Sequence, residues 1–268
     1  MHISDNSALA LVASVLLLGG SGAQAQTLAS RVAAVGTGTV RLEYASQPGV
    51  CGNGRGNISI RRGDGTSTFT GTYSRGSRNE WEDECEPGPV RVALDVERGT
   101  VTALRAYVGG RWRGDADLEL GAVPAAEASR FLVEIAARGA SRPAKDAIFP
   151  AMLADAPSPW PALLAIAKDD NRPRDVRSSA LFWVGQVVED EATKGLEEIV
   201  DADGDREVRK SAVFSLSQRH RDESIPALIR IARTNRDREI RKSAIFWLAQ
   251  SRDDRAIRYF EEVLLGAR

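Results

Sequence analysis

The sequence predicts a chain of two folded regions: a small antiparallel β-domain, followed by a right-handed α-solenoid of about four helical hairpins. Three observations lead to this prediction. Residues 26–120 are rich in glycine and alternate between apolar and polar side chains, as short strands joined by turns do. From Pro124 to residue 268 the apolar residues follow the helical period instead. In this helical region a single motif returns at a fixed spacing, which is the sequence signature of stacked repeats.

The N-terminal segment 1–25 has the form of a secretory signal peptide. An apolar run at residues 8–18 precedes Ala23-Gln24-Ala25, a small-x-small cleavage site that would leave Gln26 as the first mature residue. We therefore expect an exported protein of the periplasm or cell envelope. Because no Lys or Arg precedes the apolar run, a misplaced start codon, a weak signal and a buried N-terminal helix are alternatives. No other apolar run has the length that a membrane span needs.

The β-domain is expected to contain short strands and one disulfide. Strand-like segments occur at 39–44, 58–61, 66–73, 90–96 and 101–108. The last two flank a hairpin turn at 97–99. The two cysteines of the chain, Cys51 and Cys85, both lie in this domain, and an oxidising compartment would let them pair. Free thiols are the alternative for a cytosolic protein.

The helical region opens with a helix expected over 125–138, because a proline precedes it and a glycine follows it. The motif itself occupies residues 175–186, 207–218 and 239–250, at a spacing of 32 residues. A weaker copy surrounds residues 147–149, and a second apolar helix follows each copy. Each unit is therefore a helical hairpin.

Each motif helix is too apolar to stand alone. Val208, Ala212 and Leu216 form one stripe, and their apolar neighbours widen it around the helix. Such a helix needs covering on both sides, so the units must stack. An arginine recurs at one position of the motif, as Arg177, Arg209 and Arg241. We expect these arginines to form a ladder with acidic groups and helix-end carbonyls of adjacent units.

The motif reads Asp/Glu-Val/Ile-Arg-Lys/Ser-Ser-Ala-x-Phe-x-Leu-x-Gln, and a segment such as Ile-Pro-Ala-Leu follows it. It resembles the HEAT-like repeat named after the phycobilisome lyases, over roughly residues 140–265. That resemblance implies the fold and leaves the activity open, since the family includes bilin-attaching lyases, a di-iron hydroxylase and protein-binding scaffolds. The order of export signal, β-domain and repeats resembles exported bacterial HEAT-repeat proteins.

The residues suggest no catalytic set, metal site or cofactor. His220 is the one histidine beyond the signal segment, and catalytic centres need several groups that converge. The acidic run 80–86 could offer oxygens to a calcium ion, but it lacks the spacing of a calcium loop, so a solvated loop is the preferred interpretation. Positive and negative charges balance over the chain, which disfavours a nucleic-acid partner.

The predicted function is that of a non-catalytic scaffold that binds another protein. We expect the second helices to line a concave groove, with partner-binding cations at Lys194, Arg230, Arg233 and Arg258. A bilin-lyase-like protein or subunit is one alternative. Glycan binding by the β-domain through Trp81 and Trp112 is the other. Two further tryptophans, Trp183 and Trp247, are expected to be core residues, since aromatic side chains bury large areas.

Overall fold

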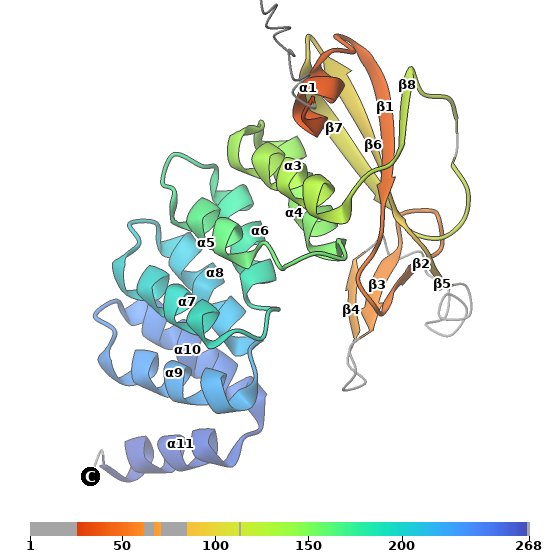
Figure 1. Cartoon of the computed structure of the whole chain (residues 1–268). Helices are drawn as coiled ribbons and strands as arrows, with labels where there is room; N and C mark the ends of the chain where they lie inside the picture. The colour runs from red at the N-terminus through yellow and green to blue at the C-terminus, as the bar shows by residue number, and fades with distance from the viewer. Residues whose placement is uncertain (1–25, 62–66, 71–84, 113, 267–268) are drawn as a thin grey trace, which may run out of the picture.

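The computed structural model describes residues 26–61, 67–70, 85–112 and 114–266, with the backbone alone at 67–70. The expected signal segment 1–25, Trp81 and residues 80–84 of the acidic run lie outside the described residues. Figure 1 shows the β-domain at one end of a stack of helices, with the last helix at the opposite end. The predicted fold class, a small β-domain followed by a helical solenoid, is confirmed.

The strands of the described residues form two sheets of four strands each, in the orders β7-β6-β1-β8 and β4-β3-β2-β5. Their bounds are β1 (Gly38–Tyr44), β2 (Val50–Gly52), β3 (Ile58–Arg61), β4 (Ser67–Thr70), β5 (Glu86–Pro87), β6 (Val90–Glu97), β7 (Thr100–Tyr107) and β8 (Leu118–Ala122). The first sheet packs on the helices through its alternating apolar side chains. On β6, for example, Val90, Val92, Leu94 and Val96 are all buried.

The hairpin expected around residues 97–99 joins β6 to β7. Arg98 and Gly99 both have positive φ, 51° and 73°, as the two central residues of a type I′ turn do. This turn type matches the right-handed twist of the flanking strands. Arginine adopts a positive φ less readily than glycine does, so the glycine at the second position accounts for much of the preference for this turn type.

The strands β2, β5 and β8 were not expected from the sequence, and two further features of the β-domain also differ from the expectation. A short helix, α1 (Leu28–Ala33), precedes the first strand, capped by the Thr27 side chain and anchored by buried Leu28 and Val32. It is too short to give a periodic signal in the sequence. Strand β8 pairs with β1 in parallel, so the sheet is mixed and not purely antiparallel. The long connection between β7 and β8 makes this possible, because a parallel neighbour needs a crossover.

The disulfide joins Cys51 on β2 to Cys85, directly before β5, with 5.2 Å between the Cα atoms. Strands β2 and β5 are also hydrogen-bonded neighbours. The bridge therefore fastens the edge of the second sheet at the point where the chain returns to it. Closing a loop of this length stabilises a fold by about 3–4 kcal/mol in the chain-entropy model.

The solenoid consists of helices that pack in antiparallel pairs, α3 with α4, α5 with α6, α7 with α8 and α9 with α10, before a last helix, α11. Their bounds are α3 (Ala125–Arg138), α4 (Ser141–Leu153), α5 (Trp160–Lys168), α6 (Arg174–Val184), α7 (Asp190–Ala202), α8 (Arg206–Ser217), α9 (Arg221–Thr234), α10 (Arg238–Ser251) and α11 (Asp254–Gly266). Helix α3 has the bounds that its flanking proline and glycine predicted. The motif alanines Ala180, Ala212 and Ala244 are fully buried, where a larger side chain would separate the helices.

The two domains share one hydrophobic core and are joined by hydrogen bonds at the end of α4. The Tyr44 hydroxyl donates to the Pro150 carbonyl (2.7 Å). The Gln47 side chain donates to the Met152 carbonyl, and its backbone N–H donates to the Leu153 carbonyl (both 2.8 Å). The last carbonyls of a helix have no partner within it. The chain leaving β1 therefore caps α4, which fixes the β-domain against the first hairpins.

Candidate functional site

The recurring arginine of the motif links a hairpin to the next at two of its three positions. Arg177 is 4% exposed. Its Nε donates to the Ala167 carbonyl at the end of α5 (2.8 Å), which lies within its own hairpin. Its two terminal nitrogens pair with Asp170 at 3.1 Å and with buried Asp203 in the loop of the next hairpin. A single side chain thus ties two consecutive interhelical loops.

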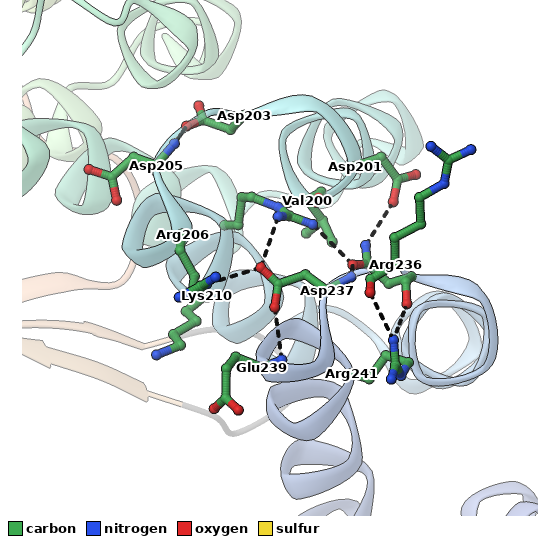
Figure 2. A network of polar contacts seen from close by, with 12 residues as sticks. Val200, Asp201, Asp203, Asp205, Arg206, Lys210, Arg236, Asp237, Glu239 and Arg241 are labelled. Carbon is green, nitrogen blue, oxygen red and sulfur yellow. Dashed lines mark hydrogen bonds and ion pairs between the residues drawn. The ribbon is translucent and has the colours of Figure 1, made fainter.

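Arg209 repeats this arrangement one hairpin later. Its Nε donates to the Val200 carbonyl (2.7 Å), and its terminal nitrogens reach Asn235 (3.0 Å) and Asp237 (3.3 Å) of the following loop. Arg241 donates to the carbonyls of Asn235 and Arg236 (2.8 and 3.0 Å). Figure 2 shows Arg241 directed at these carbonyls, beside the cluster around Asp237. The contacts of this ladder are intramolecular, so we interpret it as a structural device of the stack.

A second row of arginines reinforces the same edge. Arg174 and Arg206 pair with Asp205 (2.7 Å) and Asp237 (3.0 Å) of the next loop. These two aspartates also cap the helices α8 and α10 by accepting backbone N–H groups. The hydrogen bond from Arg206, and then that from the Glu239 N–H (Figure 2), hold the pKa of Asp237 below its ordinary value. Caps and ladder are therefore one charged network.

The opposite edge of the stack is tied by arginines outside the repeated motif. Arg219 is 5% exposed and donates to the carbonyls of Val187 and Glu189 in the preceding loop. It also pairs with Glu223 at 2.6 Å. Arg255 on α11 pairs with Asp222 on α9 (3.1 Å). Sequence reasoning missed these residues because neither recurs at the repeat spacing.

The expected partner-binding cations separate into two kinds. Arg230 pairs with Glu197 and Asp201 of the neighbouring helix, both at 3.1 Å. Arg233 pairs with Glu262 and lies over the ring of Tyr259. These two arginines are therefore engaged within the stack. Lys194 and Arg258 are exposed, and neither side chain has a hydrogen-bond or ion-pair partner among the described residues.

The inner row of the stack differs from the expectation. Helices α4, α6, α8 and α10 pack on one another more closely than do α3, α5, α7, α9 and α11. We therefore interpret the motif helices, and not the second helices that were expected there, as the inner row of the stack. The second-helix row, with Lys194 and Arg258, is the outer row.

A continuous series of aromatic contacts runs along the inner row from α4 to α10. Phe149 stacks on Trp183 with ring centroids 4.7 Å apart. Phe182 lies beside Trp183 and contacts Phe214 on the next motif helix, at 5.1 and 6.2 Å. Phe214 then contacts Trp247 at 5.0 Å, and Phe246 lies beside it at the same distance. We call these six residues the aromatic row.

The aromatic row is only partly core. Trp183 is 4% exposed, as a core residue should be, whereas Trp247 is half-buried. The phenylalanines at 149, 182 and 214 are half-buried, and Phe246 is 53% exposed. Aromatic side chains that leave some of a ring accessible along one row of helices offer contact area to a ligand. The repeat position of each phenylalanine can be read from the sequence, but its partial exposure cannot.

Two hollows lie where the β-domain meets α4 and α6, and Trp183 lines both. One measures about 680 Å³ and the other about 460 Å³. Burial raises the pKa of Asp146 in the larger hollow, although Arg142 and Lys145 oppose this shift. Trp112 lies elsewhere, in a hollow of about 260 Å³ on the β-domain. There Arg41 covers its ring at 4.8 Å and Tyr107 meets it edge-on.

The described residues contain neither a candidate metal site nor a candidate membrane-spanning helix. There, no three His, Cys, Asp or Glu side chains gather as a metal ion would need. Among the same residues, each helix falls short of the length and apolarity that a bilayer crossing requires.

The helical region is similar to a known family of repeat proteins. A search of curated proteins returned no match. A family model described as HEAT repeats matches residues 160–249 and again residues 193–267. The two overlapping matches extend from α5 to the last helix, which is the region where the motif recurs and the arginine ladder lies. Over residues 160–267 the chain is therefore similar to HEAT-repeat proteins.

Proposed function

We propose that this chain is a non-catalytic scaffold that binds another protein through its HEAT repeats. Stacked helical hairpins expose long continuous surfaces of the kind that other proteins bind. The observation that carries the proposal is the aromatic row, because several of its rings stay partly exposed on the inner face of the stack. Partly exposed aromatic side chains are enriched at protein interfaces.

We further propose that the protein is exported to the periplasm or cell envelope. The apolar run at residues 8–18 and the cleavage site before Gln26 support this location. The Cys51–Cys85 bridge agrees with it, because disulfides persist in oxidising compartments. N-terminal sequencing of protein from its native host should begin at Gln26. A retained Met1 in a cytosolic fraction would contradict the location and leave the scaffold proposal intact.

The scaffold proposal is tested by chemical crosslinking in the native envelope, followed by capture of the mature chain under denaturing conditions. We expect a discrete adduct with one other protein. Recovery of the uncrosslinked chain alone, at every crosslinker length, would contradict a protein-binding role.

Glycan binding by the β-domain is a second candidate, favoured by one observation. The hollow of about 260 Å³ presents the ring of Trp112 among arginine side chains, a combination of apolar ring and hydrogen-bond donors that suits a sugar. Capture of the chain on immobilised envelope glycan, abolished by Trp112→Ala, would support this role. Retention that is insensitive to that substitution would exclude this hollow as the glycan site.

A further inference from the structure

The larger hollow has an aromatic floor and walls from both domains. Phe149, Phe182 and Trp183 come from α4 and α6, and Leu104 and Tyr107 come from β7. Its volume of about 680 Å³ lies in the range of pockets that bind small ligands or a few residues of a peptide. The hydrogen bonds between residues 44–47 and the end of α4 hold its two sides together. The hollow is therefore preformed, and a ligand need not order it.

Two cations at this hollow make no side-chain hydrogen bond or ion pair with the described residues. Arg55 and Lys145 are exposed and line it, and neither side chain has a hydrogen bond or ion pair with another described residue. The third cation, Arg105, is paired with Asp95 at 3.0 Å. Asp146 is the one acidic residue in the described lining. This lining therefore carries a surplus of positive charge, which favours an anionic group on the ligand.

Beyond the hollow the charges are compensated. Lys210 and Lys242 stand on α8 and α10, each paired with a glutamate of its own helix, Glu207 at 3.0 Å and Glu239 at 2.9 Å. What continues along the row is the aromatic surface, through Phe214 to α10. A nucleic acid needs cations that follow its backbone, and this row lacks such a track among its described residues. The surface instead suits a ligand that is anionic at one end and apolar along its length.

The repeat of the row fits an extended polypeptide. Phe182 and Phe214, on successive motif helices, have ring centroids 6.2 Å apart. A fully extended chain advances about 3.3 Å per residue and directs every second side chain to the same face, so side chains on one face lie about 6.6 Å apart. Every second side chain would therefore meet one aromatic position of the row. Three steps from α4 to α10 correspond to about six residues.

Resting on the proposed scaffold function, we propose that the occupant of this surface is an extended polypeptide segment of the partner protein. Its acidic end lies in the hollow beside Arg55 and Lys145, and an apolar or aromatic side chain at every second position packs on the aromatic row. Gln218 and Gln250 are exposed one turn after Phe214 and Phe246, on the same helix faces. Their amides are placed to hydrogen-bond the backbone of such a segment, as in other grooves that bind extended peptides.

The test measures binding of synthetic peptides to the full mature chain by fluorescence anisotropy. The probe has nine residues: seven with phenylalanine at every second position and threonines between, and two glutamates at one end. It is made with the glutamates at either terminus. We expect saturable binding of at least one of the two. The double variant Arg55→Glu with Lys145→Glu should weaken it at least tenfold, and should bind the same peptide with lysines in place of the glutamates more tightly than wild type does.

The matched control is Lys194→Glu with Arg258→Glu, which reverses two exposed, unpaired cations on the outer row. It should bind the acidic probe as wild type does, and both double variants should unfold at the wild-type temperature. Equal loss in both variants, or equal affinity for a peptide whose phenylalanines are scrambled, would overturn the proposal. Should the groove variant still crosslink the native partner at full yield, the scaffold function stands and this peptide groove is refuted.

Discussion

Replacing Arg177 by alanine is predicted to destabilise the stack more than the same change at any other arginine of the ladder. The side chain is 4% exposed and reaches three acceptors in two consecutive hairpins. Its partner Asp203 has a side chain that is 5% exposed. Removing the guanidinium leaves that buried carboxylate with one remaining donor, the backbone N–H of Asp205. Breaking a buried ion pair from one side costs about 3–5 kcal/mol.

The cost should decrease along the ladder, because burial and partners decrease along it. The Arg209 side chain is 15% exposed, and its partner Asp237 keeps a second arginine, Arg206. We expect Arg209→Ala to cost about 1.5–3 kcal/mol, the range of a lost hydrogen bond to a charged group. Arg241 donates to backbone carbonyls alone, and its replacement should cost about 1 kcal/mol or less.

Urea unfolding followed by circular dichroism measures these differences, provided that the slope of each transition is unchanged. Two controls isolate the charge. Arg177→Met keeps most of the packed aliphatic stem and should still show most of the destabilisation that Arg177→Ala causes. Adding Asp203→Asn to Arg177→Ala should restore some of it, since the unpaired charge is removed. A cost below about 1 kcal/mol at Arg177, or equal costs at Arg177 and Arg241, would refute the reasoning.

Three further predictions follow from other contacts. Arg206 holds the pKa of Asp237 below its ordinary value, so this carboxylate stabilises the folded chain above about pH 4 and loses that effect as pH falls through the lowered pKa. The stability difference between wild type and Asp237→Asn should therefore shrink towards acid in pH-dependent unfolding; a difference that grows there would contradict the assignment. Tyr44→Phe should cost about 1 kcal/mol or more, because the Pro150 carbonyl loses its donor; a neutral effect on the urea midpoint would show that water replaces the hydroxyl. Both cysteines should resist alkylation in the native protein, and reduction should lower stability by about 3–4 kcal/mol, whereas free thiols in exported material would contradict the bridge.

The elements of the fold that sequence predicted are those with a local or periodic signal. The motif predicted the positions of the repeated helices, because each copy places the same apolar residues against the same neighbours. The hairpins differ from the expectation, since each motif helix packs most closely on the helix that precedes it and not on the one that follows. Helix α3 followed from its flanking proline and glycine, and the hairpin turn from Arg98-Gly99 between two alternating segments. Such signals act over a few residues, and they determine the local structure unless tertiary contacts favour another conformation.

The elements that sequence did not predict depend on contacts between distant segments. The parallel pairing of β8 with β1, the capping of α4 by residues 44–47 and the bonds made by Arg219 join residues that no local pattern connects. The inner row was assigned to the second helices because a repeat pattern defines two rows without stating which packs more closely. The proposed binding surface is therefore the aromatic row, and no longer the exposed cations such as Lys194.

The central claim, that the inner row of the stack binds a protein, is tested most directly by site-specific photocrosslinking in the native envelope. A photoreactive phenylalanine analogue is placed at Phe246 on the inner row or, as control, at Arg258 on the outer row. The account predicts a crosslinked protein partner from position 246 and none from position 258. A partner that crosslinks from position 258 alone, or no crosslink from either position, would contradict it.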